Sequence, residues 1–144
     1  MTDQIDLELG DTQAIIAECK AQKCTVEQTA YILATAYWET AQTMKPVREA
    51  YWLSETWRKD NLRYYPYYGR GYVQLTWEDN YKFAGATLGF GDQFVGDPDQ
   101  VMEPKVSTKI LVLGMMHGWF TGKKLTDYVG NGQKSYDAAR RVVN

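Results

Sequence analysis

A stripe of apolar residues at helical spacing follows Thr25. Its members lie four, three, four, four and three positions apart: Val26, Ala30, Leu33, Tyr37, Ala41 and Met44. This spacing predicts an amphipathic helix whose stripe faces the core. Thr25 and Gln28 have the spacing of a capping box, and Pro46 disfavours helical backbone at the residue before it. We therefore expect a long helix between Thr25 and Pro46, with Glu39 in its last two turns.

Helical patterns also occur elsewhere in the chain. Pro104 opens a run, continuing to Phe120, that is apolar over most of its surface, so this helix is expected at the centre of the core. Shorter helical segments are expected at residues 12–20, 51–60, 78–88 and 135–144.

Residues 64–81 form a segment rich in aromatic side chains, YYPYYGRGYVQLTWEDNY. Gly69 and Gly71 interrupt it, and the alternation in the following YVQLTW favours a strand or a small hairpin. Residues 89–100 are rich in glycine and aspartate and predict a loop. The fold class expected from these patterns is mainly α with a small β-hairpin.

Length and charge limit the possible functions. A chain of 144 residues is sufficient for one domain with one core, so we expect a single domain over residues 1–144. The net charge of -2 provides no general attraction to nucleic acid or to anionic lipid, and neither is expected as a partner. The first twenty residues do not resemble a secretory signal, and no apolar run is long enough to predict membrane insertion.

The metal-binding residue types are sparse. Cys19 and Cys24 have no second cysteine pair, and His117 is the only histidine, so neither a metal site nor a cofactor is expected. Two reduced thiols are favoured over a local disulfide.

Glu39 stands in the otherwise uncharged segment YILATAYWET. The macrodipole disfavours an anion near a helix C-terminus, and apolar neighbours add a desolvation cost, so both effects favour the protonated carboxyl. A carboxyl that keeps its proton near neutral pH can act as a general acid. The alternative is an ordinary surface glutamate on an amphipathic helix.

Glycoside hydrolysis requires a second carboxylate, either to activate water or to attack the sugar. The spacing does not choose among five candidates: Glu49, Glu55, Asp60, Glu78 and Asp79.

The aromatic segment 64–81 is compatible with a sugar ligand. Tyrosine and tryptophan present flat apolar faces with a polar edge, which match the apolar face and hydroxyl rim of a pyranose ring. Gln74, Thr76 and Asn80 alternate with or follow apolar residues there and would supply hydrogen bonds. The alternative is that these rings are structural, since aromatic residues in strands most often belong to the core.

YYGRGYVQLTWEDNY resembles the YYGRGPIQLSHNYNYG signature of glycoside hydrolase family 19, the plant-type chitinases, and more closely that of their bacteriophage endolysin relatives. AYWETAQTMKPVREA resembles the HETGGF…PVEEN segment of the family. DPDQVMEPKVSTKILVLGMMHGWF and ARRVVN resemble its NPDLV…SFKTAIWFWM helix and its final RxxNG-type element. The resemblance extends in order from about Tyr31 to the C-terminus. It implies a lysozyme-like α+β fold with the hairpin beside an active-site cleft.

The resemblance also assigns roles to individual residues. Glu39 would be the general acid and Glu49 the general base, while Thr76 stands where the family has a serine that helps to hold the attacking water. The residues implied to bind or shape the substrate groove are Tyr68, Arg70, Gln74, Asn80 and Lys109. The family inverts the anomeric carbon, which requires carboxyl groups about 6.5 to 9.5 Å apart.

Three features depart from the family pattern. Trp38 stands where the family has a histidine before the acid, and Ala41 and Gln42 occupy about the positions of the family's glycine pair. Compared with the family pattern, one additional residue separates Glu39 from Glu49. The chain ends at Asn144, where the family usually continues.

The function implied is that of a monomeric phage-type endolysin that hydrolyses the β-1,4 bonds of peptidoglycan glycan strands. It would be made in the bacterial host cytoplasm and would reach the cell wall with the help of a holin-type release partner. The alternatives are a chitinase, a lytic transglycosylase, a non-catalytic glycan-binding module and a structural protein that uses the groove to bind a partner.

Overall fold

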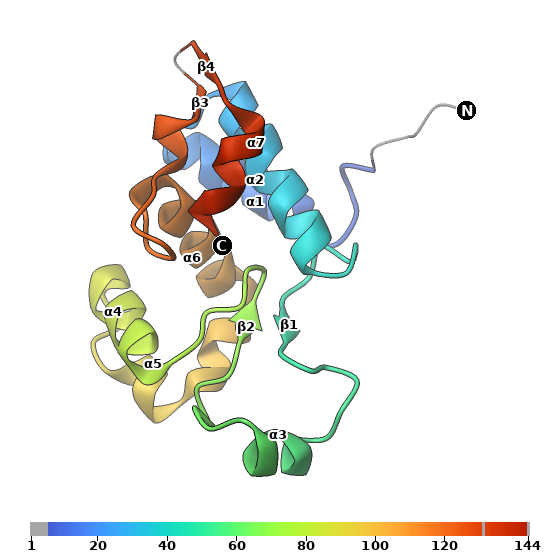
Figure 1. The fold of residues 1–144 in the computed structure, drawn as a ribbon, viewed down its shortest axis with the longest axis vertical. Helices are drawn as coiled ribbons and strands as arrows, with labels where there is room; N and C mark the ends of the chain where they lie inside the picture. The colour runs from blue at the N-terminus through green and yellow to red at the C-terminus, as the bar shows by residue number, and fades with distance from the viewer. Residues whose placement is uncertain (1–5, 131, 144) are drawn as a thin grey trace.

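The computed structural model describes residues 6–130 and 132–143. Helices dominate this part of the chain, and its strands are only two residues long (Figure 1). The elements, in chain order, are α1 (Thr12–Ala21), α2 (Val26–Glu39), β1 (Val47–Arg48), α3 (Glu55–Asn61), β2 (Arg70–Gly71), α4 (Glu78–Leu88), α5 (Gln93–Gly96), η1 (Pro98–Met102), α6 (Pro104–His117), η2 (Leu125–Asp127), β3 (Val129–Gly130), β4 (Gln133–Lys134), α7 (Tyr136–Ala139) and η3 (Arg140–Val142).

Helix α6 lies between two groups of buried side chains. Leu111 and Met115 pack in a core shared with α1 and α2, whereas Val106 and Ile110 pack in a second core with α4, α5 and η1. Figure 1 shows α1, α2 and α7 on one side of α6 and α4 and α5 on the other. Burial on both sides explains why α6 is apolar over most of its surface. The predicted central helix is confirmed.

Helix α2 begins as predicted, but a different face is buried. The capping box is formed, since the Thr25 hydroxyl accepts the Gln28 N–H and the Gln28 side chain accepts the Thr25 N–H. The core side chains of this helix are Ile32 and Ala36, whereas Val26 on the predicted stripe is 82% exposed. The predicted stripe is therefore wrong, because contacts with α1, α6 and β3 determine which side of α2 is buried.

The chain leaves the helical conformation earlier than Pro46 alone would require. Helix α2 ends at Glu39, and Ala41, Gln42 and Met44 all have positive φ angles. The Met44 side chain is buried, and its carbonyl accepts a 2.8 Å hydrogen bond from the Asp11 N–H at the start of α1. This irregular segment turns the chain from α2 toward β1 and leaves Glu39 at the helix end.

Of the strand and the small hairpin expected at YVQLTW, the structure forms the small hairpin, which is closed by a tight turn. β2 pairs antiparallel with β1, and the main-chain groups of Arg70 and Leu75 exchange two hydrogen bonds across the turn. Gln74 within the turn has a φ of 62°, which is incompatible with a continuous strand over YVQLTW.

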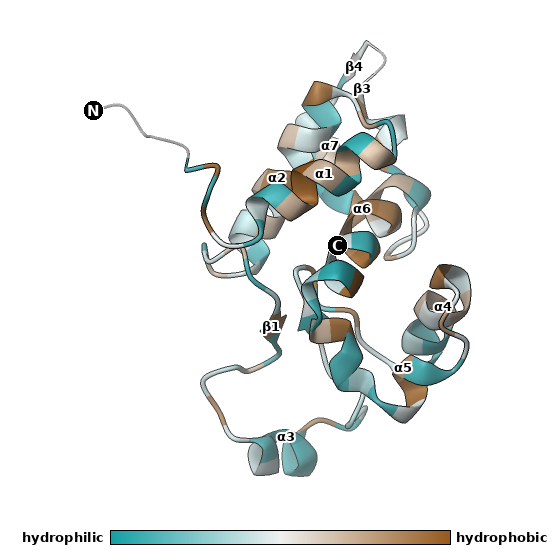
Figure 2. Ribbon diagram, turned by 180° about the vertical axis from the view of Figure 1, so that it is seen from behind, coloured by the Kyte–Doolittle hydropathy of each residue, from teal (hydrophilic) through white to brown (hydrophobic). Residues whose placement is uncertain are grey.

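The remaining expectations differ from the structure mainly in length. α4 spans the predicted residues, and α3 is the short helix expected near residue 60. Residues 89–100 are not all loop, because they contain α5 and the beginning of η1, which has Pro98 at its first position. The ribbon of α3 is largely hydrophilic, whereas α1 and α6 carry hydrophobic bands (Figure 2).

Of the helices that the structure describes, none combines the length and apolar character needed to cross a membrane.

Candidate active site

Four of the site residues predicted from the sequence line one cavity of about 230 Å³. Glu39 contributes from the end of α2, Gln74 and Thr76 from the turn after β2, and Asn80 from the first turn of α4. The other lining residues are Val73, Leu75, Trp77, Trp119, Phe120 and Val143. We refer to this space as the Glu39 cavity. It places a carboxyl group near hydroxyl, amide and aromatic groups, which suits a sugar ligand.

Hydrogen bonds fix the turn that forms one wall of the Glu39 cavity. The Gln74 amide donates to the Val47 carbonyl of β1 at 2.9 Å, and the Thr76 hydroxyl donates to the Gln74 carbonyl at 2.8 Å. The Asn80 amide donates to the Thr76 carbonyl at 2.7 Å. A Cβ atom at position 69 would lie 2.6 Å from Oε1 of Gln74, so this close approach requires Gly69. The Thr76 oxygen can still accept a hydrogen bond from water.

Glu39 differs from the sequence-based expectation in its surroundings. Its side chain is exposed instead of desolvated among apolar residues, so the burial on which the expected protonation depended is absent. Glu39 also lines a second, larger cavity of about 900 Å³, together with Tyr31, Trp38 and Arg140. Glu39 therefore lines two cavities, and a ligand bound in either cavity would cover its carboxyl group.

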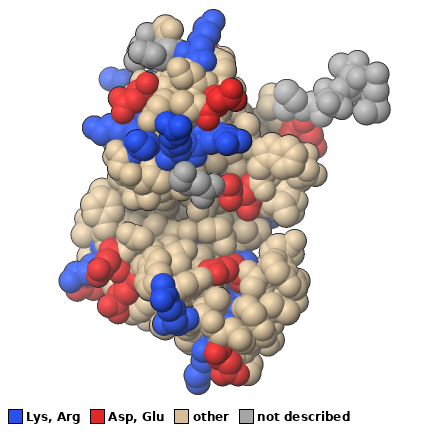
Figure 3. All heavy atoms as spheres, viewed as in Figure 1, with Lys and Arg blue, Asp and Glu red and all other residues tan. Residues whose placement is uncertain are grey.

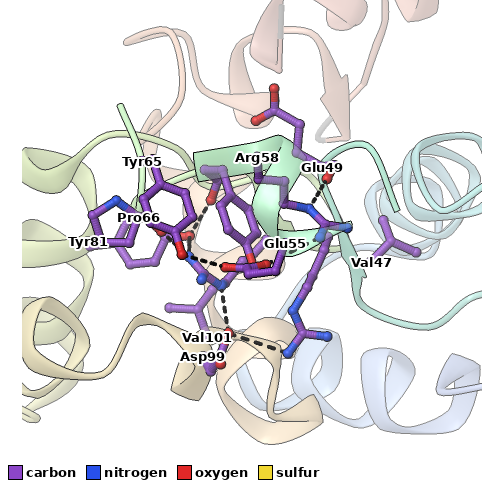
Figure 4. A network of polar contacts seen from close by, with 12 residues as sticks. Val47, Glu49, Glu55, Arg58, Tyr65, Pro66, Tyr81, Asp99 and Val101 are labelled. Carbon is purple, nitrogen blue, oxygen red and sulfur yellow. Dashed lines mark hydrogen bonds and ion pairs between the residues drawn. The ribbon is translucent and has the colours of Figure 1, made fainter. Parts of the chain in front are cut away.

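Glu49 is held through both oxygens of its carboxylate. The Tyr64 hydroxyl donates to Oε2, and the Gly69 N–H donates to Oε1 at 2.9 Å. The Glu49 N–H also donates to the Gly69 carbonyl at 2.7 Å. Arg58 donates to the Glu49 carbonyl at 2.8 Å and to that of Ala50 at 3.0 Å, as the contacts around Arg58 in Figure 4 illustrate. Glu49 is half-buried and does not itself line the Glu39 cavity.

Part of the chain is similar in sequence to plant chitinases. It is 45% identical over 47 residues to the acidic 26 kDa endochitinase of Solanum lycopersicum, a match that covers 32% of this chain and 19% of that protein. It is 35% identical over 78 residues to chitinase 6 of Oryza sativa subsp. japonica, covering 54% of this chain and 26% of that protein. No protein-family model matches the chain.

The chitinase-like fold is also found in a solved structure. Chitinase C from Streptomyces griseus HUT6037 superposes with a TM-score of 0.62 at 23% sequence identity, over 81% of this chain and 49% of that chain. The mainly helical, lysozyme-like α+β fold expected from the sequence is thereby confirmed. The chain spans about a fifth to a quarter of the length of these curated relatives and about half of the solved chain. The similarity supports the resemblance to the plant-type chitinases of glycoside hydrolase family 19.

Tyr68 and Arg70 are buried in the protein instead of lying on the surface of a groove. Both side chains are almost completely buried, at 1% and 3% exposure. The Arg70 guanidinium lies over the Tyr68 ring at 3.9 Å and donates to Asp99 at 3.0 Å and to the Tyr81 hydroxyl at 3.0 Å. Figure 4 shows Tyr81 and Asp99 in this network. In this arrangement Tyr68 and Arg70 join β2 and the segment before it to α4 and η1.

Lys109 is not brought to the Glu39 cavity. Its ammonium group lies 3.2 Å from Oε1 of Glu18, on the side of α6 that packs against α1. Lys109 does not line the Glu39 cavity, and the sugar contact that the resemblance implies for it stays a prediction.

Glu55, one of the five candidates for the second carboxylate, accepts hydrogen bonds from three residues. The hydroxyl groups of Tyr65 and Tyr68 donate to its two oxygens at 2.9 and 3.1 Å, and Nη1 of Arg58 lies 3.2 Å from Oε1 (Figure 4). With three donors, one of them the buried Arg58 cation, the Glu55 carboxylate is suited to hold this aromatic segment together.

Trp77 and Tyr64 are functional candidates that the sequence did not single out. The Trp77 indole is 46% exposed and lines the Glu39 cavity. It packs on the Tyr64 ring with centroids 4.8 Å apart, and the Arg63 guanidinium lies 5.3 Å from its ring. Both residues lie in the aromatic segment already noted, but its composition could not distinguish exposed rings from buried ones.

The described residues contain no group of three or more His, Cys, Asp or Glu side chains that could hold a metal ion. Cys19 and Cys24 are free thiols, and Cys19 is buried.

Proposed function

We propose that this protein is a glycoside hydrolase that cleaves β-1,4 bonds between N-acetylated sugars, with peptidoglycan glycan strands as its substrate. The observation that carries the proposal is the Glu39 cavity, in which a carboxyl group meets Gln74, Thr76 and Asn80. The similarity to chitinases supports the same reaction class.

In the proposed mechanism, Glu39 donates a proton to the glycosidic oxygen and Glu49 activates a water molecule on the opposite face of the sugar. Thr76 accepts a hydrogen bond from this water, because its own hydrogen is donated to the Gln74 carbonyl, and the Asn80 amide binds a sugar substituent. The Glu49 carboxylate keeps lone pairs for water, because each of its oxygens accepts only one of the hydrogen bonds found. The product is the inverted, α anomer.

The proposed biological setting is that of an endolysin. The protein would act as a monomer, be made in the cytoplasm of a bacterial host and reach the wall through a holin-type partner. The support for this setting is the resemblance of YYGRGYVQLTWEDNY to the phage branch of the family. Expression in a bacterial host, with and without an agent that permeabilises the inner membrane, tests it: lysis is expected only with the agent.

The second candidate is a chitinase, which the printed names of the similar plant proteins favour. Digestion of purified sacculi and of chitin oligosaccharides, followed by mass spectrometry, distinguishes the two substrates. We expect muropeptides whose mass includes one added water for each cleaved bond. Proton NMR should show the α anomer first. Products from chitin alone would favour the chitinase. Products ending in 1,6-anhydro sugars would favour the transglycosylase, and glycan binding without any cleavage would favour the non-catalytic module.

Glu55→Gln is expected to reduce hydrolysis less than tenfold while lowering stability by about 1 to 3 kcal/mol. Glu55 accepts hydrogen bonds from Tyr65 and Tyr68 and pairs with the buried Arg58, so its charge stabilises the loop and not the reaction. Rates on sacculi and urea unfolding measure the two effects. Glu78→Gln, on the exposed first turn of α4, serves as the comparison and should change the rate little.

A further inference from the structure

Tyr64 connects the Glu49 carboxylate to the wall of the Glu39 cavity. Its hydroxyl donates to Oε2 of Glu49, which is fifteen positions away in the sequence. Its ring packs on Trp77 at 4.8 Å between centroids with the planes inclined by 54°. Trp77 in turn lines the cavity with Glu39. One side chain thus contacts both the candidate base and a surface on which a sugar can stack.

We propose that Tyr64 is a positioning residue, which orients the Glu49 carboxylate and keeps it in register with a sugar stacked on Trp77. The inference rests on the proposed function. It assigns Tyr64 no contact with the substrate and no proton transfer.

The hydrogen-bond chemistry supports this role. A phenol donor stabilises a carboxylate more than a neutral carboxyl, and a base must be ionised to accept a proton from water. Burial, and then the hydrogen bond to Glu49, raise the pKa of Tyr64 to about 12, so the phenol remains a donor over the pH range in which such an enzyme works. The Gly69 N–H, at 2.9 Å from the other oxygen, fixes the second end of the carboxylate.

The adjacent residue offers a matched control. Tyr65 also donates its hydroxyl to a carboxylate, at 2.9 Å from Oε2 of Glu55. Its ring lies beside Tyr68 at 6.0 Å between centroids, and it does not line the Glu39 cavity. Tyr64→Phe and Tyr65→Phe therefore each remove one hydrogen bond from a phenol to a carboxylate. Only Tyr64→Phe removes a hydrogen bond to Glu49.

The experiment compares both variants with the unmodified protein on purified sacculi. Tyr64→Phe keeps the ring on Trp77 and removes one hydrogen bond to a charged group, so kcat should fall about 10- to 100-fold while KM changes less than about threefold. This split between kcat and KM is expected because the base loses the contact that orients it, whereas the ring that packs on Trp77 is kept. Tyr65→Phe should leave both kcat and KM unchanged. A merely structural role for Tyr64 would lower the unfolding midpoint in urea and would not lower kcat alone.

The outcomes separate this inference from the function on which it rests. If Tyr64→Phe keeps the kcat of the unmodified protein while Glu39→Gln abolishes hydrolysis, the positioning role is wrong and the hydrolase stands. If the unmodified protein cleaves no glycan, the proposed function fails, and NMR of ¹³C-labelled glutamate carboxyl groups provides the readout. The chemical shift of the Glu49 carboxyl carbon should then change in Tyr64→Phe but not in Tyr65→Phe, and an unchanged chemical shift in Tyr64→Phe would refute the inference.

Discussion

Glu39→Gln is expected to reduce the hydrolysis of purified sacculi by about 100- to 10,000-fold, the usual contribution of a general acid. The amide has almost the same size as the carboxyl but cannot donate an acidic proton to the leaving oxygen. Glu39 is exposed at the end of α2 and lines the two cavities, so the substitution should not disturb the fold. Initial rates of reducing-end release measure the effect, and pull-down with insoluble sacculi should show that binding is retained.

Glu27→Gln provides the control for this substitution. Glu27 is an exposed glutamate on the first turn of the same helix, and it lines neither of the two cavities that contain Glu39. It should retain full activity with an unchanged unfolding midpoint. Lysis that survives in Glu39→Gln would contradict the proposed acid and with it the inverting mechanism.

The start of α2 was predictable from the sequence, whereas its rotation was not. The capping box depends on residues within one turn, so Thr25 and Gln28 suffice to place it. The buried face depends on what packs against the helix. Apolar residues occur on two sides of α2, and the structure buries Ile32 and Ala36 while the other side, with Tyr31 and Trp38, lines the larger cavity. Periodicity alone could not decide between two apolar sides.

The candidate active site shows the same difference between what local sequence determines and what packing determines. The resemblance placed Glu39, Gln74, Thr76 and Asn80 in one groove, and the structure brings these side chains to one cavity. It also grouped Lys109 with them, but a pairing with Glu18 on the α1 side of α6 holds this residue elsewhere. A motif specifies residue types along the chain, whereas the direction of a helical side chain depends on packing.

The support around Glu49 had no sequence signal. It depends on Tyr64 and Gly69, which are fifteen and twenty positions away, and on Arg58, which binds the Glu49 and Ala50 carbonyls. Ala50 has a positive φ of 51°, which is unusual for a residue with a side chain. Such contacts form only after the loop between β1 and α3 folds against α3 and the segment between α3 and β2, so local patterns could not reveal them.

Glu49→Gln is the second substitution with a large expected effect, a loss of about 100-fold or more in kcat on sacculi, because an amide cannot accept a proton from the attacking water. The fold should be retained, since the amide oxygen can still accept a hydrogen bond from either Tyr64 or Gly69. Urea unfolding and the KM value test whether the loss is catalytic, and KM should change little.

Two comparisons determine whether Glu49 or its neighbour is the base. Glu49→Asp keeps the charge but shortens the side chain by one methylene, which draws the carboxylate away from Tyr64 and Gly69, so it should also be strongly impaired. Glu55→Gln removes a carboxylate that is bound to Arg58, Tyr65 and Tyr68 and should be mild by comparison. If Glu55→Gln abolished hydrolysis while Glu49→Gln did not, the additional residue after Glu39 would have displaced the base to position 55. Tyr65 and Tyr68, which donate to Glu55, would then replace Tyr64 as the residues that position it.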